Sequence, residues 1–233
     1  MIELLEARRL MAVVVTEGLP GFYEITGDAA DNVVAISVDK SARTFTLGGV
    51  VYGGVAYINV YGNGGNDSIT LVGSGSGPVA ASLKGGAGND LLVLDHVDGA
   101  IWGGDGDDQM YFTDSFRAQA YGEVGNDHIV INGACVDAEI RGGDGEDTLD
   151  ATGSSVGVFL YGEGNRDRLF GSPLDDLLDG GPGRDFFFGR GGDDMFYARD
   201  GEPDYLIGGP GNDTAICDAF EMNTSSTEFL ITD

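Results

Sequence analysis

The sequence is poor in cysteine, histidine and basic residues. Its 233 residues include two cysteines, Cys135 and Cys217, and two histidines, His96 and His128, too few for a disulfide scaffold or a zinc site. Only 12 Lys and Arg stand against 39 Asp and Glu, and the formal net charge of −27 would repel phosphate backbones and anionic membranes. We therefore expect no nucleic-acid partner. No apolar run approaches the ~20 residues of a membrane span, so no transmembrane segment is predicted.

Signals for catalysis and for general secretion are missing as well. The sequence contains neither the H-E-x-x-H of zinc proteases nor the G-x-x-x-x-G-K of phosphate-binding loops. Residues 153–157 have the G-x-S-x-G form, but both histidines precede the serine, whereas hydrolases need one after it. Residues 1–15 lack the basic start and long apolar stretch of a secretory signal. We expect no enzyme; the alternative is a carbohydrate-active solenoid that would use Asp150 and Asp179.

Glycine, by contrast, is abundant, and its 41 copies fall in a repeat. Five hexapeptides match G-G-x-G-x-D at every fixed place, at 85–90, 103–108, 142–147, 180–185 and 208–213. Successive loop aspartates are 18–23 residues apart in the first half of the chain and 9–10 apart in the second. A coil of about 18 residues with two turns explains both spacings, because the second half then carries an acidic loop on both sides. Looser copies end at Asp67, Asp127, Asp167, Asp176, Asp194 and Asp204.

Apolar residues recur at fixed places after each loop. The second residue after every loop aspartate is apolar, and in the first five copies so is the fourth, a period of two that predicts a short strand. So short a strand cannot bury its apolar face alone, so neighbouring coils must stack about 4.8 Å apart with parallel hydrogen bonds. The prediction is an all-β parallel β-roll (β-solenoid) of about 18–20 residues per coil, with small N-terminal and C-terminal caps. The expected divisions are a cap or sorting segment at 1–20, a degenerate first coil with a hairpin at 21–61, the roll at 62–216 and a C-terminal cap at 217–233.

The loops have the chemistry of a calcium site. Glycine permits the positive φ that lets loop carbonyl oxygens converge, and the sixth-place aspartate adds a carboxylate. Such an oxygen cage suits Ca²⁺ better than Mg²⁺ and does not suit zinc, copper or iron. The coil length places Asp67, Asp90, Asp108, Asp127, Asp147, Asp167, Asp185 and Asp204 along one edge and Asp176, Asp194 and Asp213 along the other. The expected metal-site residues are these aspartates together with Gly85, Gly86, Gly88, Gly103, Gly104, Gly106, Gly125, Gly142, Gly143, Gly145, Gly180, Gly181, Gly183, Gly192, Gly208, Gly209 and Gly211.

One ion between neighbouring loops would give up to about nine Ca²⁺ ions. Because aligned carboxylates repel one another, metal removal is expected to unfold at least residues 147–213. The alternative is that the loops are ordinary solenoid turns that happen to be acidic. The loops before Asp167, Asp176 and Asp204 depart from the glycine pattern, and weak or empty sites are expected there.

These repeats resemble the RTX, or haemolysin-type calcium-binding, nonapeptide G-G-x-G-x-D-x-U-x, in which U is apolar. The resemblance covers about residues 62–216. It implies a right-handed parallel β-roll, with calcium held by loop carbonyl oxygens and the sixth-place aspartates. It also implies a bacterial protein that is secreted through a type I pathway or resides at the cell surface. Residues 5–11, LEARRLM, are similar to the LEPR-x-LL motif of planctomycete-type surface proteins; a helical cap is the alternative for this segment.

The function expected from these features is that of a calcium-responsive structural module. It would act as a folding switch for export and as a rigid surface or adhesive rod, in contact with surface polysaccharide or another cell-surface protein. The alternative is an accessory polysaccharide-binding module of a secreted enzyme system, which would use exposed aromatics such as Trp102, Phe186 and Phe188. We expect a monomer with two free thiols.

Overall fold

A computed structural model describes residues 13–218, 222–223 and 229–231, and every regular element in these ranges is a β-strand. The described part of the chain has no helix that is long and apolar enough to span a bilayer. The strands form two sheets of twelve. Sheet A contains, in spatial order, β1 (Val14–Glu17), β2 (Phe22–Thr26), β6 (Tyr57–Gly64), β8 (Ala80–Ala87), β10 (Asp98–Asp105), β12 (Gln119–Val124), β14 (Glu139–Asp144), β16 (Phe159–Gly164), β18 (Leu177–Asp179), β20 (Met195–Ala198), β22 (Thr214–Cys217) and β24 (Phe229–Ile231). Sheet B contains β23 (Met222–Asn223), β21 (Tyr205–Ile207), β19 (Phe186–Phe188), β17 (Arg168–Phe170), β15 (Thr148–Ser154), β13 (His128–Gly133), β11 (Gln109–Thr113), β9 (Leu91–Asp95), β7 (Ser68–Ser74), β3 (Val33–Asp39), β4 (Thr44–Leu47) and β5 (Val50–Gly53).

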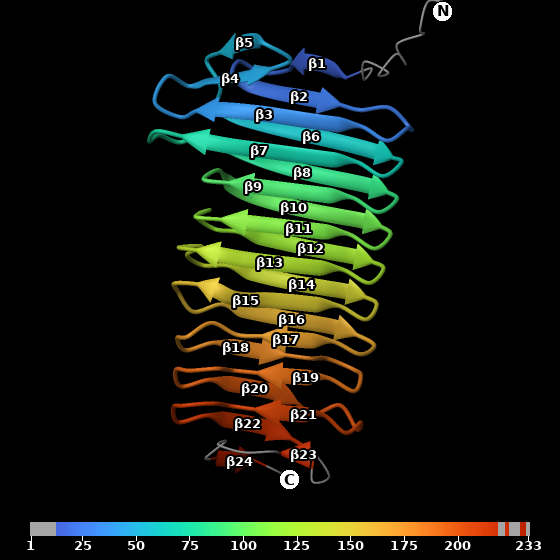
Figure 1. The fold of residues 1–233 in the computed structure, drawn as a ribbon, viewed down its shortest axis with the longest axis vertical. Coiled ribbons are helices and arrows are strands. Elements are labelled where there is room, and N and C mark those ends of the chain that lie inside the picture. The colour runs from blue at the N-terminus through green and yellow to red at the C-terminus, as the bar shows by residue number, and fades with distance from the viewer. Residues whose placement is uncertain (1–12, 219–221, 224–228, 232–233) are drawn as a thin grey trace, which may run out of the picture.

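From β6 onward the chain alternates between the two sheets and adds one strand to each sheet per coil (Figure 1). Strands that are neighbours in a sheet from β6 onward run parallel, and equivalent repeat positions lie side by side. Met110, Ile129 and Leu149, for example, are in register across β11, β13 and β15. The parallel β-roll that the repeat spacing predicted is therefore confirmed.

The core lies between the two sheets and consists of the apolar positions that the repeat predicts. The residue two after each loop aspartate is at most 1% exposed in all eleven copies. Outward neighbours in the same strands stay half-buried or exposed, so a strand such as β11 alternates strictly along its length. These eleven core residues are Ile69, Leu92, Met110, Ile129, Leu149, Leu169, Leu178, Phe187, Phe196, Leu206 and Ala215.

The ends of the roll differ from its middle. At the N-terminal end β3 pairs with β7 on one side and forms an antiparallel hairpin with β4 on the other, and β5 extends this meander. Phe45 stacks on Tyr52 at 4.6 Å and meets Tyr23 edge-on at 5.0 Å, which closes the core there. At the other end β23 and β24 each add one more strand. The expected helical cap and the sorting motif of residues 5–11 lie outside the described residues.

Two side-chain expectations can be compared with the structure. Cys135 and Cys217 are buried and form no disulfide, as predicted. Phe187 is in the core, as predicted. Its neighbours Phe186 and Phe188, which the sequence predicted to be exposed, are half-buried. The reason is stacking between coils, since Phe188 lies 4.9 Å from Phe170 with nearly parallel rings.

Adjacent leucines in β9 offer a matched test of the core. Leu92 is 0% exposed, whereas Leu91 is 37% exposed. Leu92→Ala is expected to lower the free energy of unfolding of the calcium-saturated protein by about 2–5 kcal/mol, because it opens a cavity between the sheets. Leu91→Ala should change it by no more than about 0.5 kcal/mol. Equilibrium chemical denaturation measures both, and equal losses would contradict this placement of the core.

Candidate metal centre

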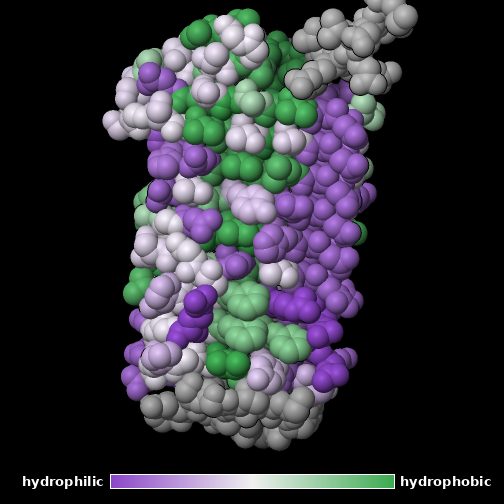
Figure 2. Space-filling model, viewed as in Figure 1, coloured by the Kyte–Doolittle hydropathy of each residue, from purple (hydrophilic) through white to green (hydrophobic). Residues whose placement is uncertain are grey.

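The loop aspartates stand in two ladders, one along each edge of the roll. The long edge consists of the loops that lead from sheet A to sheet B. There the backbone N–H of each loop aspartate donates to the Oδ1 atom of the loop aspartate in the next coil at 2.7–2.8 Å. The short edge joins Asp176, Asp194 and Asp213 in the same way at 3.0 Å. Figure 2 shows the long edge as a continuous hydrophilic band beside the apolar middle of a sheet. The long ladder contains Asp67, Asp90, Asp108, Asp127, Asp147, Asp167, Asp185 and Asp204, the set that the spacing predicted.

One oxygen of most of these carboxylates is buried without a partner. Every ladder aspartate is at most 5% exposed. In the eight aspartates named below, the Oδ1 atom accepts the ladder hydrogen bond, but Oδ2 has neither a hydrogen bond nor contact with solvent. Such an orphaned anionic oxygen is costly unless a cation or a proton compensates it. The Oδ2 atoms in this state include those of Asp67, Asp90, Asp108, Asp127, Asp147, Asp167, Asp185 and Asp194.

The space around each orphaned oxygen is kept open by the first glycine of the loop. A Cβ atom on Gly103 would lie 2.2 Å from Oδ2 of Asp108 and 2.8 Å from the carbonyl oxygen of Gly122 in the next coil. The carboxylate and a carbonyl oxygen from the neighbouring loop thus border the same small space. Hard oxygens of these two kinds are the ligands that Ca²⁺ prefers, so the residues present fit calcium.

Side chains alone do not make a metal shell. Over the described ranges, no three Asp, Glu, His or Cys side chains form a group that could hold an ion. The carboxylates would therefore need backbone carbonyl oxygens from two stacked loops to complete a cation shell. The cage of main-chain oxygens that the glycine pattern predicts stays a prediction.

The second and fourth loop places require positive φ, which explains the remaining glycines. Gly104 has φ 117° and Gly106 has φ 137°, values that side chains adopt only under strain. Looser loops keep this backbone with other residues in the second place, since Glu123 and Glu163 have φ of 78° and 77°. The loops before Asp127 and Asp167 therefore keep the positive φ of the complete loops at the second place.

The three loops that depart from the glycine pattern do not behave alike. Asp167 and Asp204 take their places in the long ladder. Asp176 differs, because its Oδ1 accepts from Val158 N–H and Ser172 Oγ, while its Oδ2 accepts from Ser172 N–H at 2.6 Å. Both of its oxygens are satisfied by protein donors, so Asp176 has the least need of a cation.

The sequence reading missed one loop and several glycines. Residues 27–32 form a further turn, in which Asn32 N–H donates to Oδ1 of Asp67 at 2.7 Å. A neutral amide thus occupies the sixth place and ends the ladder without another buried charge. The pattern G-x-x-x-x-N before a strand could have revealed it. First-place glycines of the looser loops were also missed, namely Gly62, Gly122, Gly162, Gly171 and Gly189, each of which abuts the Oδ2 atom of its own loop aspartate.

Burial governs the electrostatics of the ladders. Loss of hydration raises the pKa of the carboxyl groups above the ordinary 3.8, neighbouring carboxylates raise it further, and the ladder hydrogen bond opposes both. The pKa values reach about 6 for Asp90 and Asp147, about 7 for Asp108, Asp127, Asp185 and Asp194, and about 8 for Asp167. Without a cation these groups would therefore titrate around neutral pH, and Asp167 would be mostly protonated there.

Other candidate groups of the sequence do not assemble into a site. Asp150 lies on β15 in sheet B and Asp179 on β18 in sheet A, each beside a core leucine that points inward. The two carboxylates therefore face out from opposite sheets and cannot act together as an acid and base pair. His96 is exposed, pairs with Asp95, and lies 3.4 Å from Asp114.

The raised pKa values predict how the metal-free fold responds to pH. A carboxyl group whose pKa is higher in the folded state stabilises that state when protonated, fully below about pH 4, and this contribution is lost as pH rises through about 6 to 8. In metal-free buffer the chain should therefore gain β-sheet structure on acidification from pH 8 to 5. With saturating calcium the melting temperature should instead fall over the same range, because protons then compete with the metal. Circular dichroism measures the β-sheet content and the melting curves, and stabilisation by acid in both buffers, or in neither, would contradict this.

Comparison with known families agrees with the geometry. A model of four copies of the RTX calcium-binding nonapeptide repeat matches residues 82–95, 100–114, 139–154, 170–203 and 199–216. These segments contain all five complete loops, and the match supports calcium binding by a structural module. A search of curated proteins finds no significant match. The repeat match and the in-register loops of the parallel β-solenoid together show that the chain is an RTX-type repeat protein.

Proposed function

We propose that the chain is a calcium-dependent folding module of a secreted or cell-surface protein, in which ions between stacked loops hold neighbouring coils together along each edge. The observation that carries this proposal is the row of buried, partnerless Oδ2 atoms, most of which lie near a carbonyl oxygen of the next coil, as at Asp108 and Asp147. Bound calcium supplies the charge that these oxygens lack. The ladder aspartates and the loop glycines named above are the residues that would hold it.

The charge of the chain supports the same conclusion. Eight carboxylates in one ladder leave room for about seven ions on the long edge, and the short edge adds about two at most. Each divalent ion would offset two of the 27 excess negative charges. Because the unfolded chain cannot form the stacked loops, calcium binding and folding are one process.

This coupling suits a protein that crosses a membrane unfolded and meets calcium outside the cell. The resemblance to RTX repeats supports export, and the regular stack of coils supports a role as a rigid surface or adhesive rod, acting as a monomer. The repeat region would be residues 62–216, with the first coil before it and a cap after it.

Calcium titration tests the proposal directly. In metal-free buffer at pH 8 the far-ultraviolet circular dichroism of the chain is expected to be that of an unfolded protein, and added calcium should restore the β-sheet spectrum cooperatively. Magnesium at the same concentration should not, because it requires six near-ideal octahedral ligands and retains its water. A spectrum that is already native without metal, and unchanged by calcium, would refute calcium-dependent folding.

A pair of isosteric substitutions distinguishes ladder carboxylates that need a cation from one that does not. Asp147→Asn removes the charge of an orphaned carboxylate and should lower the number of bound ions by about one or two, since each rung borders two intervals. Asp176→Asn should leave the number unchanged, because its carboxylate is satisfied by Val158 and Ser172. Native mass spectrometry in calcium counts the ions, and equal losses in the two variants would show that the orphaned oxygens do not select the sites.

A further inference from the structure

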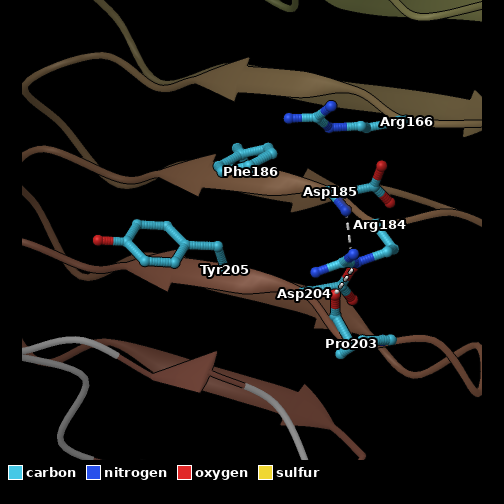
Figure 3. A pocket seen from close by; sticks show the side chains of 7 residues that line it. All are labelled: Arg166, Arg184, Asp185, Phe186, Pro203, Asp204 and Tyr205. Carbon is cyan, nitrogen blue, oxygen red and sulfur yellow. Dashed lines mark hydrogen bonds between the residues drawn. The ribbon is translucent and has the colours of Figure 1, made fainter.

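A pocket near the C-terminal end of the long edge combines arginine and aromatic side chains. Its volume is about 190 Å³, and Arg166, Arg184, Phe186 and Tyr205 form its accessible walls. Figure 3 shows Phe186 and Tyr205 extending from successive strands, with Arg166 beside Phe186 and Arg184 near the neighbouring loop. Pro203 and the buried ladder aspartates Asp185 and Asp204 complete the lining. The carboxylate of Asp185 accepts the N–H of Asp167 within the ladder, so the pocket borders the outer side of the metal loops.

The two arginines interrupt a second ladder that runs along the outside of the loops. At the fifth loop place, Asp31, Asn66, Asn89, Asp107 and Asn126 each accept the N–H of the next fifth-place residue. Arg166 and Arg184 take this place in the two loops before Asp167 and Asp185 and replace acceptors with cations. The outer ladder is interrupted at these two loops, while the inner ladder continues unchanged.

These arginines are also an electrostatic exception. The chain has 12 Lys and Arg against 39 Asp and Glu, yet Arg166, Arg184 and the adjacent Arg168 gather in two coils. Arg141, by comparison, is held by Glu139 and Glu163 at 2.7 and 2.8 Å. Neither Arg166 nor Arg184 forms an ion pair with a carboxylate of the described residues. Their charge is therefore available to a ligand.

The guanidinium groups of Arg166 and Arg184 are oriented by their neighbours, and most of their N–H donors remain available to a ligand. The Arg166 guanidinium carbon lies 4.9 Å from the centre of the Phe186 ring, a contact that orients the group and leaves its N–H groups free. The Arg184 Nε atom reaches only the carbonyl oxygen of Pro203 at 3.5 Å. Two oriented guanidinium groups favour a planar carboxylate, which each can bind through two parallel hydrogen bonds.

The size and surroundings of the pocket limit what the rest of the ligand can be. At about 30 Å³ per water molecule, 190 Å³ holds roughly six waters, enough for one six-membered ring and not for an oligomer. The Phe186 and Tyr205 rings, 5.7 Å apart, supply the apolar contact that a pyranose ring uses. A long polyanion would meet the acidic surface on both sides and be repelled.

We infer that this pocket binds a single carboxylate-bearing sugar residue, such as a uronic acid at the end of a saccharide chain. The carboxylate would lie between Arg166 and Arg184, with the ring against Phe186 and Tyr205. This goes beyond calcium-dependent folding, because the ligand contacts arginines outside the metal ladder.

The test uses the full chain in buffer with fixed free calcium and isothermal titration calorimetry with D-glucuronate, D-glucose and sulfate. Glucuronate should bind saturably. Glucose and sulfate should bind at least about tenfold more weakly, because glucose lacks the carboxylate and sulfate lacks the sugar ring. Arg166→Gln and Arg184→Gln should each weaken glucuronate binding about tenfold or more. Arg190→Gln, the same change at an exposed site on the opposite edge, should leave it unchanged.

Several results would overturn the assignment. Glucuronate that fails to bind the folded protein, or binds all the arginine variants equally, would show that the pocket is not the site; the second result would point to binding through calcium. Sulfate as tight as glucuronate would exclude recognition of a sugar. The circular dichroism of each variant in calcium separates these outcomes from loss of folding, which would bear on the calcium proposal instead.

Discussion

The whole structure depends on carboxylates that are buried in register at the edges of the roll. Most ladder aspartates, such as Asp127 and Asp147, accept a backbone N–H from the coil before them through Oδ1 and leave a partnerless Oδ2 near a carbonyl oxygen of the coil after them. The first bond fixes the position of one coil on the next. The second oxygen makes that position unfavourable until a cation is present. Assembly of the coils and binding of metal are therefore expected to depend on the same atoms.

This arrangement explains why so acidic a chain can form a compact fold. The core between the sheets is thin, because each coil contributes only a few inward side chains, such as Leu149 and Ala151 from β15. Such a core gains only a modest free energy per coil. The edges must then contribute to stability as well. Carboxylates without a compensating charge would instead destabilise the fold. The neutral Asn32 at the first rung shows how the ladder ends where no further coil can share an ion.

Much of this fold could be read from the sequence because the repeat has few degrees of freedom. The spacing of the aspartates set the coil length, and the apolar residue two places later set the core, as Leu92 and Phe187 show. The reading was less accurate where tertiary contacts decide. Stacking between coils half-buries Phe186 and Phe188, and Ser172 satisfies both oxygens of Asp176. The loop that ends at Asn32 was not predicted, because an asparagine stands at its sixth place. The arginine pocket depends on which loop places become neighbours, so spacing alone could not predict it.

The most direct measurement of the central claim is anomalous diffraction from crystals grown in calcium. The account predicts a row of anomalous peaks along the long edge, one between successive loops, each next to the Oδ2 atom of an aspartate such as Asp108 or Asp147 and a carbonyl oxygen of the neighbouring coil. An ordered roll with the same ladder hydrogen bonds and no peaks at these positions would contradict it, because the buried carboxylates would then be stable without a metal.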